Sequence, residues 1–228
     1  SFTLFLSNFD ETTDLPVALL APTKEGYTFN GWYDNGDFIG APVTEIPLGT
    51  VADEVVYANF TINTYTLQFT DHDDAVLQTA DYEFGADLGL VTPPVDPTRT
   101  GYTFDAWDAA IPATMPAADT TIQATYVINS YNLDFIDWDS GEIQTGLFEF
   151  GADTSGETPA DPTRTGYTFN SWDTATPATM PANDVVITAT YDINSYTLQF
   201  LDNDTNVLQT ADYEFGADLS AVTAPDPT

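Results

Sequence analysis

Three pairs of aspartates are the side chains in this sequence best suited to binding a metal ion. Each pair is an Asp-x-Asp step, and the steps stand at Asp71 and Asp73, Asp137 and Asp139, and Asp202 and Asp204. A further aspartate follows each pair, at Asp87, Asp153 and Asp218. Calcium takes about six to eight oxygen ligands from carboxylates, carbonyls and water, and an Asp-x-Asp turn supplies only about two of them.

Two interpretations of these aspartates stay open. In the first, each step is part of a calcium site, although the glycine and glutamate spacing of an EF-hand loop is missing. In the second, the carboxylates accept hydrogen bonds from their own turns and otherwise face solvent. The first interpretation makes calcium the one candidate cofactor, and the second predicts none.

The residue types needed for catalysis are too few for an active site. The chain has no cysteine and one histidine, His72, and the matching positions in the other copies of its motif are Trp138 and Asn203. Nucleophilic triads and imidazole–metal sites need partners that the sequence does not supply. Carboxylates are abundant but scattered, and no glycine-rich phosphate loop occurs. We therefore expect no enzyme.

The three basic residues occupy one recurring position. Lys24, Arg99 and Arg164 each precede Gly-Tyr-Thr-Phe by two residues, and Trp32, Trp107 and Trp172 each follow its Phe by three. A cation in so acidic a chain should pair with a carboxylate, while its stem covers an aromatic ring. These six residues are predicted to have structural roles.

The charge balance limits the possible partners. The 36 acidic and 3 basic residues give a net charge of −33. Nucleic-acid binding needs a basic footprint, so it is not expected. Nor does the chain contain an apolar stretch of the length that inserts into a membrane. Like charges repel over a Debye length of about 10 Å at 0.1 M salt, which favours an extended array.

An internal repeat sets the domain organisation. Tyr65–Phe69 recurs at 131–135 and again at 196–200, with nearly the same spacing between copies. Such a period indicates tandem modules. We predict a divergent first module at 1–62, a second module at 63–128, a third module at 129–193 and a partial module at 194–228. Phe2–Leu6 aligns either with an opening strand or, across a smaller gap, with a second strand, and on both alignments a longer array is expected.

The local patterns predict strands. Tyr65, Leu67 and Phe69 alternate with polar residues, and the Asp-rich turn that follows predicts an opening hairpin. Residues 85–90 fit a short helix or a loop, and the prolines at 93–97 predict irregular chain. The modules meet without a linker, and the apolar parity changes between Ile128 and Tyr131, so a bend or bulge is expected at Asn129-Ser130.

The segment Pro-Thr-Arg-Thr-Gly-Tyr-Thr-Phe-x-x-Trp, followed by Met-Pro-Ala-x-Asp-x-x-Ile-x-Ala-Thr-Tyr, resembles the Listeria–Bacteroides repeat, which includes the B repeats of internalin-type proteins. The resemblance covers nearly the whole chain. It implies β-grasp-like modules in tandem within secreted and cell-wall adhesins of bacteria, with no catalytic residues. The near-absence of lysine and the heavy acidity depart from many relatives, which puts electrostatic ligand binding in doubt.

These observations predict a mainly β chain, a tandem array of small modules that are each one repeat period long and are set end to end in an extended rod. The predicted function is a stiff acidic stalk or spacer in an extracellular surface protein of a bacterium. The alternative is a binding or self-assembly module that contacts a receptor, a glycan or an identical chain through strand edges and hairpin tips. Neighbouring repeats are the expected partners in either case.

Overall fold

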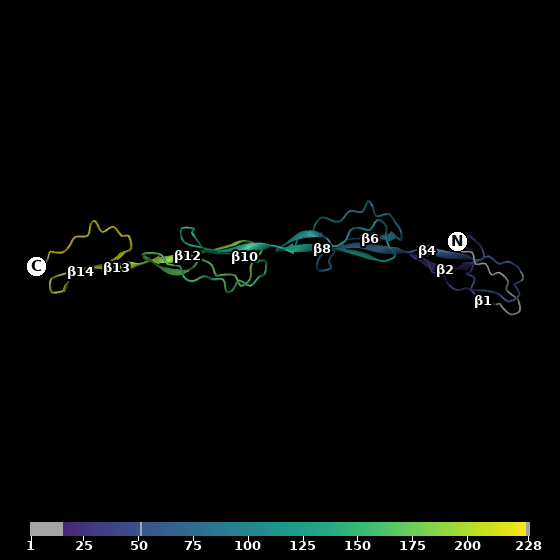
Figure 1. Ribbon diagram of the computed structural model, residues 1–228, viewed down its shortest axis with the longest axis horizontal. Helices are drawn as coiled ribbons and strands as arrows, with labels where there is room; N and C mark the ends of the chain where they lie inside the picture. Colours follow the sequence, from purple (N-terminus) through teal and green to yellow (C-terminus); the bar gives the residue numbers. More distant parts are fainter. Residues whose placement is uncertain (1–15, 51, 227–228) are drawn as a thin grey trace. The chain divides into compact units, whose positions relative to one another are not determined.

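The computed structural model describes residues 16–50 and 52–226, and all regular structure in this part of the chain is β (Figure 1). The mainly β tandem array predicted from the repeat is confirmed. Its strands are β1 (Val17–Ala18), β2 (Tyr27–Tyr33), β3 (Glu45–Ile46), β4 (Tyr57–Ile62), β5 (Thr64–Thr70), β6 (Val76–Glu83), β7 (Tyr102–Trp107), β8 (Thr120–Ile128), β9 (Ser130–Ile136), β10 (Glu142–Glu149), β11 (Tyr167–Trp172), β12 (Val185–Ile193), β13 (Ser195–Leu201) and β14 (Val207–Glu214). The expectation for Phe2–Leu6 lies outside the described residues.

The contacts divide the chain into two compact units. The first is Ser1–Pro97 with Phe104–Tyr126, and the second is Thr98–Thr103 with Val127–Thr228. Among the residues that the structure describes, no helix has the length and apolar character needed to cross a membrane.

The second module folds into a four-stranded sheet with the order β6-β5-β8-β7. The opening strands β5 and β6 pair antiparallel, as the alternating pattern predicts, and β5 also pairs parallel with β8. Register places Phe69 of β5 opposite Ile122 of β8. Their side chains form a core with Leu67, Leu88 and Met115, each of which is buried. The core therefore joins the opening hairpin to the second half of the module.

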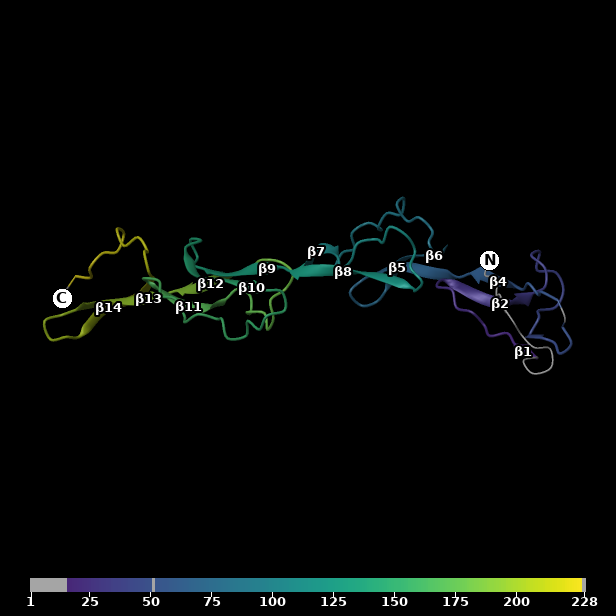
Figure 2. The same ribbon diagram turned by 45° about the vertical axis from the view of Figure 1, so that its right-hand side comes forward.

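The third module repeats this sheet with the order β10-β9-β12-β11, and its strands lie side by side in Figure 2. Phe135 of β9 stands opposite Ile187 of the parallel strand β12, and both are buried with Leu133 and Met180. The same apolar positions thus make the same core one repeat period later.

The first module and the partial module contain shorter sheets within the described residues. In the first, β2 pairs with β4 and β1 with β3, over a core of Trp32, Val56 and Ala58. In the partial module, β13 and β14 form a two-stranded hairpin.

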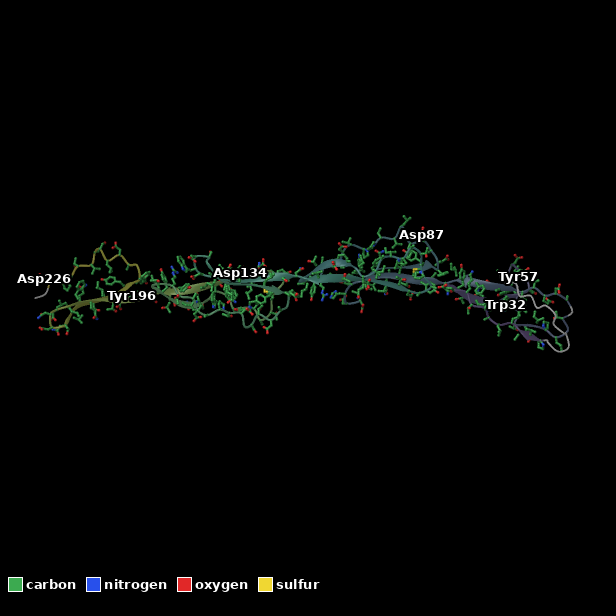
Figure 3. The ribbon with its side chains drawn as sticks, in the orientation of Figure 1. Trp32, Tyr57, Asp87, Asp134, Tyr196 and Asp226 are labelled. Atoms are coloured by element: carbon green, nitrogen blue, oxygen red, sulfur yellow. The ribbon has the colours of Figure 1, made fainter. Side chains whose placement is uncertain are left out.

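Two local predictions are resolved by the structure. Residues 85–90 form turns and a bridge between Asp87 and Thr114, so the loop alternative is correct and the helix alternative is wrong. Figure 3 labels Asp87 on this loop. The expected irregularity at Asn129-Ser130 is a one-residue break, because β8 ends at Ile128 and β9 begins at Ser130. The strand before Asn129 (β8) and the strand after it (β9) therefore belong to different sheets.

Candidate functional site

The three Asp-x-Asp steps close hairpin turns of one geometry. The amide of Asp71 donates to the carbonyl of Ala75 at 2.8 Å, and the amide of Asp74 donates to the carbonyl of Asp71 at 3.1 Å. The same pair of bonds recurs in the turns after β9 and β13. The left-handed position of the three turns holds Asp74, Ser140 and Thr205, with φ of 65°, 68° and 65°.

The first aspartate of two of these turns also accepts a bond from the last strand of its module. The Tyr126 hydroxyl donates to Asp71 Oδ1 at 2.6 Å, and the Tyr191 hydroxyl donates to Asp137 Oδ1 at 2.7 Å. The bond from Tyr126 is the main reason why the pKa of Asp71 is lowered. Burial and the bond to Asp137 raise the pKa of Tyr191 to about 12. Each bond ties a hairpin tip to the strand beside it.

In the partial module the equivalent aspartate bonds within its own turn. Asp202 accepts from the Asn206 side chain and from the amides of Asp204 and Asn206. The bonds from Asn206 are the main reason why the pKa of Asp202 is lowered.

The carboxylates proposed as calcium ligands act mainly as acceptors for nearby donors. Asp71 Oδ1 accepts from the amide of His72, and Asp73 and Asp139 each accept from an amide two residues on. Asp87, Asp153 and Asp218 close turns in the same way.

Among the described residues, the one group of three or more possible metal ligands is Asp71, His72 and Asp73. It includes the histidine that the other tips replace with Trp138 and Asn203. This donor set is far from the oxygen shell that calcium takes. Calcium binding stays a prediction from the sequence.

The recurring basic residues stack on aromatic rings. Lys24 Nζ lies 3.4 Å from the centroid of the Tyr27 ring, and Arg99 Cζ lies 3.8 Å from that of Tyr102. Arg164 Cζ lies 3.6 Å from the Tyr167 ring and 3.8 Å from the Trp138 ring. Stacking of this kind was part of the sequence-based expectation.

The sequence analysis also expected each of these cations to form an ion pair with a carboxylate. In the described part of the chain, neither Lys24 nor Arg164 has a carboxylate within salt-bridge distance. Rings of the same module cover these two cations, and their pairing with a carboxylate stays a prediction.

The three tryptophans that follow Gly-Tyr-Thr-Phe pack into the cores of their modules. Trp32 is 7% exposed, and its indole Nε1 donates to the carbonyl of Leu20 at 3.0 Å. Trp107 and Trp172 are half-buried, and their rings stack edge-on against Phe69 and Phe135 at 5.0 and 5.1 Å. Each tryptophan thus belongs to the packing of its own module.

The residue that joins two modules is an asparagine with four bonds. At the first junction, the amide of Asn63 donates to the carbonyl of Gly26 and its carbonyl accepts from the amide of Phe84, both at 2.9 Å. Its Oδ1 accepts from the Thr28 hydroxyl at 2.6 Å, and its Nδ2 donates to the Tyr65 hydroxyl at 3.3 Å. Thr28 precedes the junction and Phe84 follows it, so Asn63 is bonded to both modules.

Three of these bonds recur at both of the next two junctions. Asn129 is bonded to Gly101, Phe150 and Thr103 at 2.9, 2.9 and 2.7 Å. Asn194 is bonded to Gly166, Phe215 and Thr168 at 2.9, 2.8 and 2.6 Å. Asn129 also donates to the Tyr131 hydroxyl, at 3.4 Å.

A glycine and a phenylalanine from opposite sides of each junction pack in direct contact. Gly26, Gly101 and Gly166 have φ of 72°, 77° and 79°, and all three are buried. A Cβ on them would lie 2.1, 2.2 and 2.1 Å from the rings of Phe84, Phe150 and Phe215 respectively. These rings also stack edge-on with Tyr27, Tyr102 and Tyr167, with centroids 6.1, 6.0 and 6.0 Å apart.

Sequence reasoning missed the asparagine and the phenylalanine of the junction. It predicted a bend or bulge at Asn129-Ser130, but it assigned no residue to a contact between modules. The signal was present, since each asparagine precedes its phenylalanine by the same 21 residues, in Asn63 and Phe84, Asn129 and Phe150, and Asn194 and Phe215, although spacing alone names no partner.

A family model described as the Listeria-Bacteroides repeat domain matches residues 7–59, 65–127 and 131–194. Among curated proteins, internalin H of Listeria monocytogenes is 38% identical over 48% of this chain. A Gly-rich membrane protein of Evansella cellulosilytica is 27% identical over 91% of it. The matches cover 21% and 25% of those two proteins, so the chain spans about a quarter of their length or less.

Two solved structures are also similar over 57% of this chain and 100% of their own. They are the Mub-RV crystal structure and the type 2 repeat of the mucus binding protein MUB from Lactobacillus reuteri. Both are 13% identical to it, with TM-scores of 0.20 and 0.14.

Proposed function

Because the chain belongs to the Listeria-Bacteroides repeat domain family, we propose that it is a non-catalytic spacer in a bacterial surface protein, with an extracellular location. Its task is to hold other parts of that protein at a distance from the cell. The family assignment and the relatives named as an internalin and a membrane protein support this setting.

The observation that carries the proposal is the repeated junction. A flexible linker would separate modules by residues that bond to neither side. Here the single residue between consecutive strands is an asparagine that bonds to both modules. The glycine–phenylalanine contact adds buried packing at the same place. A junction built this way resists bending, which a spacer needs and a catalytic domain does not.

Charge supports the same function. With a net charge of −33, the modules repel one another and other anionic surfaces. Repulsion along the array opposes folding back and self-adhesion, so it helps to keep a spacer extended.

Spin-label distances across one junction test the proposal. The chain has no cysteine, so the pair Val186→Cys and Thr210→Cys would carry the only labels. We expect one narrow distance distribution, because Asn194 and Phe215 fix the hairpin β13–β14 to the third module. Inserting Gly-Ser-Gly after Asn194 is the matched control and should broaden the distribution. An equally broad distribution in both proteins would contradict the proposal.

Small-angle scattering tests the whole array. The maximum dimension of the chain should stay constant between low and high salt, because the junction bonds do not depend on charge repulsion. A smaller maximum dimension at high salt would mean that the modules move flexibly about their junctions. A maximum dimension that increases with protein concentration would mean that the chain self-assembles.

One observation favours the alternative function of binding. Trp138 stands at a hairpin tip with 53% of its surface exposed, while the matching tips carry His72 and Asn203. Exposed aromatic rings are common in contacts with glycans and proteins. An array of immobilised glycans, probed with the wild type and with Trp138→Asn, would separate the two functions. Retention that Trp138→Asn abolishes would favour binding over a spacer role.

A further inference from the structure

The chain enters and leaves the second and third modules through two neighbouring strands. It enters the second module along β5, directly after Asn63, and leaves along β8, directly before Asn129. These two strands pair parallel and lie next to each other in the sheet (Figure 2). The chain passes through the third module in the same way, along β9 and β12. Tension along the chain therefore acts directly on a pair of parallel strands.

Parallel pairing decides how that tension acts on the bonds between the strands. Register places Leu67 opposite Thr120 and Thr70 opposite Gln123. Tension pulls β5 toward its first residue and β8 toward its last residue, so the two strands are pulled in opposite directions along their length. They must slide past each other, which strains all the bonds between them at once. In an antiparallel hairpin that is pulled at its open end, by contrast, the bonds break one after another.

Side chains add bonds across this sliding interface in the second module. Five hydrogen bonds that involve a side chain join β8, or the residue before it, to β5 or to the turn that follows β5. They run from the Thr66 amide to Asp119 at 2.8 Å, from Gln68 to Thr121 at 2.9 Å, from Gln123 to the Asp71 carbonyl and to Asp74 at 3.0 Å each, and from Tyr126 to Asp71 at 2.6 Å.

The third module repeats two of these five bonds. They run from the Asn132 amide to Asp184 at 2.8 Å and from Tyr191 to Asp137 at 2.7 Å. The positions of Gln68, Thr121 and Gln123 are taken by Asp134, Val186 and Thr188. Asp134 accepts instead from Thr145 of its own hairpin. The three bonds that the two glutamines make are thus specific to the second module.

We propose that the parallel pair is a mechanical clamp with which each of these modules resists tension along the chain, and that the clamp of the second module is the stronger. Under tension the third module unfolds first and lengthens the chain, while the second stays folded. A surface protein held between a cell and a bound object is under such tension. The inference rests on the proposed spacer function for the source of the tension, but not for the strength of the clamp.

The additional bonds slow unfolding under force. Forced unfolding is governed by the rate constant of unfolding, and bonds that must break before the strands slide lower that rate constant. One net hydrogen bond changes a rate or an equilibrium by a factor of about 2–10. Three such bonds should make the second module unfold at least about tenfold more slowly than the third at the same force.

Single-molecule force spectroscopy on the full chain tests whether the parallel pair is a clamp. Because the chain has no cysteine, a pair of introduced cysteines can fix the two points of attachment. The pair Thr64→Cys and Val127→Cys makes β5 and β8 slide, whereas Thr64→Cys and Glu83→Cys opens the antiparallel hairpin β5–β6 from its open end. All three positions are exposed. At equal force the sliding pair should unfold at least about tenfold more slowly. Equal rates for the two pairs would overturn the clamp.

The third module is pulled in the matching geometry to test which clamp is stronger. The pair Ser130→Cys and Asp192→Cys stands at the equivalent exposed positions. This module should unfold at least about tenfold faster than the second at the same force. Equal rates, or a slower third module, would overturn the proposed order of unfolding.

A double variant assigns the difference to the glutamine bonds. Thr121→Val with Gln123→Thr gives the second module the residues of the third, so its rate under sliding should rise about tenfold. Gln78→Ala is the matched control, since Gln78 bonds to the Thr92 carbonyl away from the parallel pair, and it should change that rate by less than about twofold.

The direction of pulling separates a clamp from a general loss of stability. The double variant should speed unfolding when β5 and β8 slide, and should change it little when the hairpin β5–β6 is opened at Thr64 and Glu83. An equal effect in both geometries would overturn the assignment of these bonds to the clamp. The spin-label distances report on the junction alone, so a failure of the clamp and a failure of the spacer can be told apart.

Discussion

At the junctions, single glycines meet two separate requirements, and each can be measured. Gly101 needs a left-handed backbone, with φ of 77°, and also leaves room for the Phe150 ring. Gly101→Ala should lower the free energy of unfolding by about 2–4 kcal/mol, since a left-handed alanine costs about 1 kcal/mol and overpacking costs the rest. Urea unfolding would measure the change.

Gly151 offers a matched control for this substitution. Its φ is 79°, but no atom lies within 4 Å of the place where its Cβ would stand. Gly151→Ala should therefore cost only about 1 kcal/mol. The double variant Gly101→Ala with Phe150→Ala has no clash between the new Cβ and the ring. Its loss of unfolding free energy should therefore be smaller than the sum of the losses of the two single variants, by at least about 1 kcal/mol. Equal costs for the two glycines would show that the ring contact is unimportant.

Whether the Asp-x-Asp turns bind calcium can also be tested at single residues. Because the carboxylates of Asp71, Asp73 and Asp137 already accept bonds from nearby donors, we expect calcium to raise Tm no more than magnesium at equal ionic strength. Differential scanning calorimetry in each ion, with a chelator as reference, measures this. A saturable rise that is specific to calcium, and that Asp71→Asn removes, would establish the site instead.

Among the elements, the bond from β12 to the hairpin tip of β9 and β10 should make stability depend on alkaline pH. The folded-state pKa of Tyr191 is raised to about 12, above its value of about 10 in an unfolded chain. The contribution of this bond is therefore complete below about pH 10 and is lost as pH rises through about 12. Tyr191→Phe should lower Tm by a few degrees at neutral pH, and this deficit should shrink above about pH 10.

The comparison is made by thermal unfolding of both proteins from pH 7 to 11. Tyr126→Phe, at the equivalent bond to Asp71, tests whether the second module behaves alike. A Tm difference that stays constant across this range would contradict the raised pKa.

Local patterns predicted the strands better than they predicted what the strands meet. The alternation at 65–69 identifies β5, and the Asp-rich turn identifies the hairpin with β6, because both signals lie close together in the chain. The parallel pair of β5 and β8 joins Phe69 to Ile122 from opposite halves of the module, and no local pattern encodes that register. An aromatic neighbour was predicted for Lys24 and Arg164, but the sequence analysis did not identify the rings as those of Tyr27 and Tyr167.

For the whole molecule, the repeat made the array predictable, while the contacts between modules were not. The repeats locate each module and allow its positions to be compared with those of the other modules. That comparison showed that His72 is not part of a site shared by all modules. The bonds of Asn63 reach back to Gly26, before β2, and forward to Phe84, after β6, so they cross a module boundary. The asparagine and the phenylalanine recur equally in every repeat. Only the structure therefore reveals that they are bonded to each other.

The net charge of −33 predicts how the whole molecule responds to salt. Repulsion among carboxylates destabilises the compact state, and salt shortens its range from about 30 Å at 0.01 M to about 3 Å at 1 M. Sodium chloride should therefore raise Tm steeply at low concentration and little above about 0.5 M. The matched variant neutralises five exposed acids and changes the charge from −33 to −28; the substitutions are Glu83→Gln, Asp96→Asn, Asp105→Asn, Glu149→Gln and Asp161→Asn. Its Tm should be higher in low salt and should converge on that of the wild type in high salt. If both proteins instead show the same salt slope, preferential exclusion of the salt, and not charge screening, governs the stability of the array.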